Sequence, residues 1–146
     1  MKTKLVILNT HPIQYFAPLY KRLAQEKNID LTVLYCSRWG VNEYIDPQFN
    51  KSIKWDIPLL DGYKYKFLKN LRKTEDVNKF FNLINIEVIS DLIKNRYDFL
   101  WINGHNNFTN IIALIIAKII GTKLLMRAET QLNVKPLQIK KIIRKP

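Results

Sequence analysis

The sequence predicts an α/β fold with a Rossmann-like, mostly parallel sheet and helices on both of its faces. Short apolar runs alternate along the chain with segments whose apolar residues recur at helical spacing. The first run, Lys4–Leu8, is continuous rather than alternating, as expected for a central parallel strand that is buried on both faces. Right-handed crossovers between such strands would distribute the helices over both faces.

The first half of the chain predicts a helix, a strand, a long loop and an exposed strand. A helix is expected from about Ile13 to Lys27, because its apolar residues recur at i, i+3, i+4 and i+7. Ile29–Cys36 is rich in β-forming residues and is predicted to be the second strand. Residues 37–60 predict a long irregular segment whose aromatic residues argue against disorder. Tyr63–Leu68 alternates apolar and basic residues, which predicts an exposed strand.

The second half predicts two helices and two strands in alternation. Helical character is expected to resume between residues 74 and 85, and Asn85 is a candidate N-cap for the helix that follows. Gly121 is expected to end the last helix in a left-handed conformation. The predicted elements are, in order, the helix Ile86–Arg96, the strand Asp98–Asn103, the helix Phe108–Ile120 and the strand Lys123–Arg127.

Length and composition predict one cytoplasmic domain over residues 1–146, with a basic tail over residues 131–146. The single cysteine, Cys36, excludes an intrachain disulfide and fits a reducing compartment. The apolar stretch near the N-terminus is shorter than the roughly 7–15 residues of a signal-peptide core. The longest apolar run, residues 111–120, is shorter than the roughly 20 residues of a membrane-spanning helix.

The net charge of +12 leaves two interpretations open. The charge could reflect a lysine-rich composition, or it could favour a polyanionic partner. Nucleic acid is the weakest candidate partner, because no recognised nucleic-acid-binding motif is present. The tail could form an amphipathic helix on an anionic membrane surface, or it could be a helix that packs on the fold.

Polar residues that could bind a ligand follow three of the predicted strands. In an open α/β sheet, ligands bind beyond the carboxyl ends of the strands. The candidate residues there are His11, Gln14, Asn103, Gly104, His105, Asn106, Arg127 and Glu129.

Some of these candidates have structural alternatives. His11 could instead cap the helix that follows it. His105 lies in a Gly-His-Asn-Asn loop, where function is favoured over structure. Arg127 and Glu129 alternate along a strand, so they could pair with each other or bind a substrate together.

Several familiar motifs are absent from the sequence. There is no G-x-G-x-x-G, no G-x-x-x-x-G-K-[ST] and no Cys/His cluster at metal-ligand spacing. No D-x-D pair occurs that would hold a metal–nucleotide complex. The sequence therefore predicts no dinucleotide or metal cofactor.

Taken together, several motifs resemble the N-terminal domain of bacterial family-4-type (group 1) glycosyltransferases. The resemblance covers about residues 4–130. Its motifs are His11-Pro12-Ile13-Gln14-Tyr15-Phe16-Ala17-Pro18-Leu19, Val33-Leu34-Tyr35-Cys36-Ser37, Trp55-Asp56-Ile57-Pro58-Leu59-Leu60-Asp61-Gly62-Tyr63, Asn103-Gly104-His105 and Leu125-Met126-Arg127-Ala128-Glu129.

The resemblance implies a GT-B enzyme, with two Rossmann-like domains and a cleft between them. In this family the N-terminal domain receives a glycan or lipid-linked acceptor, and the C-terminal domain binds the nucleotide-sugar through an E-x7-E motif. No two glutamates lie eight apart here, so the donor-binding half is expected to be missing. The chain would then be a fragment, half of a split enzyme or a remnant.

The resemblance also implies roles for individual residues. His105 matches a loop histidine that faces the donor sugar, which makes it the candidate catalytic residue. His11 falls in a loop near the donor phosphates, although the frequent glycine pair of that loop is absent. Arg127 and Glu129 would shape the acceptor or donor side. Family catalysis is typically metal-independent and retaining. The competing hypothesis is a non-catalytic α/β ligand-binding or interaction module.

Overall fold

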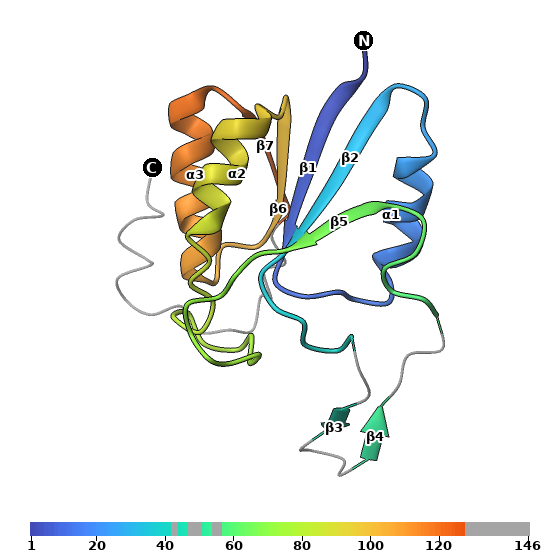
Figure 1. Cartoon of the computed structure of the whole chain (residues 1–146), viewed down its shortest axis with the longest axis vertical. Helices are drawn as coiled ribbons and strands as arrows, with labels where there is room; N and C mark the ends of the chain where they lie inside the picture. The colour runs from blue at the N-terminus through green and yellow to red at the C-terminus, as the bar shows by residue number, and fades with distance from the viewer. Residues whose placement is uncertain (42–43, 47–50, 54–56, 128–146) are drawn as a thin grey trace, which may run out of the picture.

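The computed structural model describes residues 1–41, 44–46, 51–53 and 57–127. These form a parallel sheet flanked by helices, together with a short antiparallel hairpin (Figure 1). The elements are β1 (Thr3–Asn9), α1 (Ala17–Ala24), β2 (Ile29–Tyr35), β3 (Tyr44–Asp46), β4 (Lys51–Ile53), β5 (Lys64–Phe67), α2 (Glu87–Asn95), β6 (Phe99–Asn103), α3 (Phe108–Ile120) and β7 (Lys123–Arg127).

The main sheet has five strands in the order β5-β2-β1-β6-β7, and every neighbouring pair is parallel. From the central strand β1 the chain moves outward twice, first through β2 to β5 and later through β6 to β7. Leu8 lies opposite Leu34 on one side and opposite Ile102 on the other, which aligns the carboxyl ends of three strands. This topology confirms the predicted Rossmann-like α/β fold.

Each face of the sheet has its own apolar layer, as predicted. Figure 1 shows α1 on one side of the sheet, and α2 and α3 together on the other. Ile7 points to the α1 layer and packs with Phe16 and Tyr20. Val6 and Leu8 point to the α2–α3 layer. All three β1 residues are fully buried, which confirms that the continuous apolar run forms a strand covered on both faces.

Two helical predictions in the first 85 residues are wrong. The first helix is shorter than predicted, and the second stretch is not helical. The helix expected from Ile13 begins only at Ala17, with a proline in its first turn, where a missing N–H does no harm. The helical character expected between residues 74 and 85 is absent there, and the segment forms turns. The Asn70 side chain accepts the N–H of Ile84 at 3.0 Å and that of Arg72 at 3.2 Å. Such side-chain bonds compete with a helix.

Helix α3 has the bounds that the sequence predicts. Asn107 caps its start by accepting the Asn110 N–H at 2.9 Å, and Gly121 ends it with a φ of 77°. Ile115 and Ile119 on its outer face are exposed. The small Ala113 and Ala117 face the core instead. Within the described residues, no helix has the length and apolar character needed to cross a membrane.

Asn85 is not an N-cap, contrary to expectation. The residue that precedes α2 is Ile86, and no side chain caps that helix end. The buried Asn85 amide instead donates to the carbonyl of Cys36 at 2.9 Å and to that of Leu68 at 3.0 Å. Its backbone N–H donates to the Thr109 hydroxyl at 2.9 Å. Asn85 therefore joins the ends of β2 and β5 to the start of α3.

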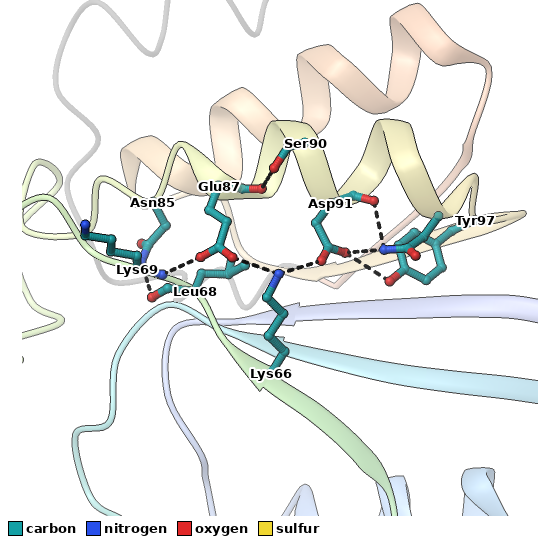
Figure 2. A network of polar contacts seen from close by, with 9 residues as sticks. Lys66, Leu68, Lys69, Asn85, Glu87, Ser90, Asp91 and Tyr97 are labelled. Carbon is teal, nitrogen blue, oxygen red and sulfur yellow. Dashed lines mark hydrogen bonds and ion pairs between the residues drawn. The ribbon is translucent and has the colours of Figure 1, made fainter.

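A charged network links the edge strand β5 to α2 (Figure 2). The Lys66 ammonium lies 2.8 Å from Glu87 Oε1 and 3.0 Å from Asp91 Oδ2. Asp91 is nearly buried, and its other oxygen accepts the Tyr97 hydroxyl at 3.0 Å. The hydrogen bond from Lys66 is the main reason that the pKa of Glu87 is lowered. This network satisfies the acids that α2 presents to the sheet.

We expect Asn85→Ala to lower the free energy of unfolding by about 2–4 kcal/mol, because two buried carbonyls would lose their donor. Urea unfolding followed by circular dichroism measures the change. Asn28→Ala is the matched control, since Asn28 is exposed, and it should change stability by less than about 0.5 kcal/mol. Equal effects of the two substitutions would contradict the structural role of Asn85.

Candidate functional site

A polar crevice of about 220 Å³ lies at the carboxyl ends of β1, β6 and β7. β1 and β6 are neighbours in the sheet, and the helices that follow them pack on opposite faces. The crevice therefore lies at the topological switch point, where open α/β sheets usually bind ligands. Its lining residues are Asn9, Thr10, Ile13, Tyr15, Phe16, Asn103, Gly104, Asn106 and Arg127.

The floor of the crevice is a hydrogen-bonded network of two amides and a phenol. Asn103 Nδ2 donates to Asn9 Oδ1 at 2.6 Å, and Asn9 Nδ2 donates to the Tyr20 hydroxyl at 2.5 Å. The Trp101 indole N–H donates to Asn103 Oδ1 at 3.1 Å. Burial raises the pKa of Tyr20, so its hydroxyl stays neutral at physiological pH. These bonds fix how both amides face the crevice.

Gly104 has a backbone conformation that a side chain would strain. Its φ is +78°, in the left-handed region that favours glycine. Its N–H donates to the Arg127 carbonyl at 2.8 Å, and its carbonyl accepts Asn110 Nδ2 at 3.0 Å. The other side-chain atom of this amide, Asn110 Oδ1, is buried and accepts no hydrogen bond from the described residues. A buried oxygen of this kind usually binds a water or another donor.

Arg127 supplies the positive charge of the crevice. It is the last residue of β7 and is exposed. Its guanidinium carbon lies 5.3 Å from the centre of the Phe16 ring, within the range of a cation–π contact. Arginine at such a position favours a ligand with a carboxylate or phosphate group.

Of the predicted site residues, Asn103, Gly104, Asn106 and Arg127 come together in the crevice. His105 and Gln14 are exposed and are not among its lining residues. Glu129 lies outside the described residues, so its predicted proximity to Arg127 stays a prediction.

His11 is also outside the crevice lining and packs against the neighbouring loop. Its ring meets that of Trp39 edge to face, with centroids 4.8 Å apart, and its Nδ1 lies 2.9 Å from the Thr10 hydroxyl oxygen. The alternative that it caps α1 is wrong, because Phe16 is the N-cap residue and no side chain bonds there. Burial lowers the pKa of His11 to about 4, so the ring is neutral at pH 7.

Sequence reasoning missed Asn9 and Tyr20. Asn9 lies one residue beyond Leu8, whose partner in the sheet is Ile102, so it is level with Asn103. The sequence could have indicated the role of Asn9, because a polar residue ends each of the two predicted strands that became β1 and β6. Tyr20 belongs to the apolar face of α1, and nothing in its spacing distinguishes a hydrogen-bonding phenol from a core aromatic residue.

Cys36 lies just beyond β2 and is fully buried. Burial raises its pKa to about 12, so the group stays a thiol. It is therefore unsuited to act as a nucleophile. Within the described ranges, no group of three or more His, Cys, Asp or Glu residues is arranged to hold a metal ion.

Among the described residues, the crevice offers amides, a hydroxyl, aromatic rings and the Arg127 guanidinium. These groups suit a ligand rich in hydroxyls. Comparison of the chain with protein-family models, with curated proteins and with solved structures gave no match.

We expect His11 to make stability depend on pH between about 4 and 6.5. In that window the unfolded chain binds a proton that the folded His11 does not, so the stability present above pH 6.5 falls as the pH falls toward 4. His11→Gln should remove this part of the loss, which is at most about 3 kcal/mol. Urea midpoints at pH 7 and pH 5 test it. An unchanged difference between the two pH values in the variant would contradict the half-buried, neutral ring.

Proposed function

We propose that the chain is the acceptor-binding N-terminal domain of a nucleotide-sugar-dependent GT-B glycosyltransferase. The observation that supports it most is the polar crevice at the switch point of the parallel sheet, because Asn103, Gly104 and Arg127, which belong to motifs of the family resemblance, line it. Its substrate would be a glycan or lipid-linked acceptor, and the nucleotide-sugar would bind mainly to a second domain.

The chemistry of the crevice suits a sugar hydroxyl. The amides of Asn9 and Asn103 are held by each other and by Tyr20, so a bound hydroxyl would meet donors and acceptors that are already oriented. The rings of Tyr15 and Phe16 line the same space and could cover the C–H face of a sugar. This combination of apolar surface with a few fixed polar groups is typical of small-ligand sites.

In the proposed reaction, an acceptor hydroxyl attacks the anomeric carbon of the donor sugar, and the nucleoside diphosphate leaves. Positive groups would stabilise the leaving phosphates, most of them on the second domain. His105 lies between Gly104 and Asn106, which both line the crevice, and it would orient the donor sugar. Arg127, with Glu129, would shape the edge at which donor and acceptor meet. No metal is required in this proposal.

One observation favours a second candidate, a non-catalytic α/β ligand-binding module. The described residues that line the crevice are mostly amides and aromatic side chains, which bind and orient a ligand. This candidate predicts saturable binding without turnover. The glycosyltransferase proposal predicts turnover once the donor-binding domain is present.

We also propose a cytoplasmic enzyme that could contact an anionic membrane through residues 131–146. The single cysteine and the basic residues of that segment support this proposal. The segment lies outside the described residues. Sedimentation with anionic vesicles at low salt tests the contact, and loss of sedimentation on deletion of the segment is the expected result.

The transfer reaction is best tested on the native polypeptide, with its intact mass checked against the full reading frame. Release of nucleoside diphosphate is measured with a panel of nucleotide-sugars and with glycan or lipid-linked acceptors. We expect Asn103→Ala to lower kcat/KM about 10–100-fold, because it removes an oriented amide from the crevice. Asn28→Ala, on the opposite edge of the sheet, should leave the rate unchanged.

His105→Ala separates the role of the histidine from that of the crevice. Normal turnover in this variant would remove His105 from the mechanism while leaving the transferase proposal intact. Binding of a sugar that depends on Asn103, without turnover by any native form of the protein, would favour the ligand-binding module.

A further inference from the structure

A second cavity, of about 550 Å³, lies at the carboxyl ends of β2 and β5, in the other half of the sheet from the crevice. Its lining is rich in charge. Four basic residues and two acidic residues contribute to it, namely Arg38, Lys69, Arg72, Lys73, Glu75 and Glu87.

Both acids of the cavity are already bound by other groups of the protein. Glu75 Oε2 accepts the Ser37 hydroxyl at 2.5 Å and the Arg38 N–H at 2.6 Å. Glu87 Oε2 accepts the Lys69 N–H at 2.8 Å, and Glu87 Oε1 lies 2.8 Å from the Lys66 ammonium (Figure 2). The carboxylates therefore hold the walls of the cavity together. Glu87 is paired with the Lys66 ammonium, whereas Glu75 is bound by neutral donors and keeps its negative charge beside the cavity.

The four cations of the cavity lack close ion-pair partners among the described residues, although Lys69 lies near enough to Glu87 to help lower the pKa of that carboxyl. In the part of the chain that the structure describes, none of them lies within ion-pair distance of a carboxylate. The Arg38 guanidinium carbon lies 4.6 Å from the centre of the Phe67 ring, which leaves the planar group's N–H donors available at its edge. Among the described lining residues these four positive charges outnumber Glu75, the carboxylate without a cationic partner, and an anion bound between them would lower their mutual repulsion.

The loop that supplies three of these cations is held in shape by side chains. Asn70 accepts the N–H groups of Arg72 and Ile84, and its own amide donates to the carbonyls of Thr74 and Asn82 at 3.2 and 2.9 Å. Lys69, Arg72 and Lys73 are therefore held by an ordered turn. The backbone of this loop then loses little conformational freedom when a ligand binds.

We propose that this cavity is a binding site for a phosphate-bearing ligand, with Arg38, Lys69, Arg72 and Lys73 as the groups that contact the phosphate oxygens. A multiply charged phosphate or pyrophosphate group matches several cations around one cavity better than a single carboxylate does. If the chain is a glycosyltransferase, the ligand would be the phosphorylated part of its acceptor. That identification rests on the proposed function, whereas the phosphate site itself does not.

Inorganic pyrophosphate, titrated calorimetrically into the full chain at an ionic strength of about 0.1 M, is the direct probe. We expect the double variant Arg72→Gln/Lys73→Gln to bind at least about tenfold more weakly, because it loses two charged hydrogen-bond donors. The matched control is Lys2→Gln/Lys27→Gln, which removes the same charge next to the amino ends of β1 and β2. It should change affinity less than about twofold, because that edge is more than a Debye length of about 10 Å away.

Vesicles distinguish the source of the phosphate. Sedimentation with phosphatidylglycerol vesicles, but not with phosphatidylcholine vesicles, that is lost in Arg72→Gln/Lys73→Gln would assign the site to a lipid headgroup. Pyrophosphate binding without vesicle binding would assign it to a soluble phosphate ester. Both results support the proposal, and neither requires sugar transfer, so the site and the transferase function can fail separately.

Two results would overturn the phosphate site. One is the absence of pyrophosphate binding at millimolar concentration. The other is equal weakening by the two double variants, which would mean that only the net charge of +12 attracts the anion. Thermal melting confirms that each variant is folded, and Arg38→Gln, on a different segment of the cavity, provides an independent variant if the loop tolerates no change.

Discussion

The side-chain amide of Asn85 donates to the carbonyls of Cys36 and Leu68, which lie just beyond the ends of β2 and β5. Because the strands stop at these residues inside the protein, their carbonyls need a donor from outside the sheet. The same residue bonds through its backbone to Thr109 in the first turn of α3. One buried residue therefore holds two strand ends and a helix in a fixed relation. The loops beyond these strand ends, which shape the larger cavity, depend on it.

The carboxyl edge of the sheet is divided into two regions of different chemistry. Around β1, β6 and β7 the groups are mostly neutral amides and aromatic rings, with Arg127 at the margin. Around β2 and β5 there are six charged residues, of which four are cations. The strand order explains the division, because the chain leaves β1 in opposite directions and contributes different loops to each half. A ligand with an uncharged, hydroxyl-rich part and a phosphate part would match both regions.

The elements that the sequence predicts well are those whose pattern is local. The bounds of α3 and β7 follow from a run of apolar residues, an asparagine cap and Gly121. The predictions that fail depend on distant partners. Asn85 is separated from Cys36 by 49 residues, and nothing near it in the sequence indicates a buried cross-link rather than a cap. The site shows the same difference. The grouping of Asn103 with Arg127 can be predicted, because both residues end a strand of the parallel sheet. The role of Tyr20 cannot, because it depends on how α1 packs on the sheet.

The buried thiol of Cys36 has a practical consequence for following the motions of this protein. A thiol whose ionisation is suppressed by burial does not react with alkylating or disulfide reagents until the surrounding structure opens. The chain has one cysteine, so every labelling event reports on the same place. That place is the junction held by Asn85. The labelling rate of the unmodified chain is therefore an intrinsic measure of how often the strand ends separate from the helices that cover them.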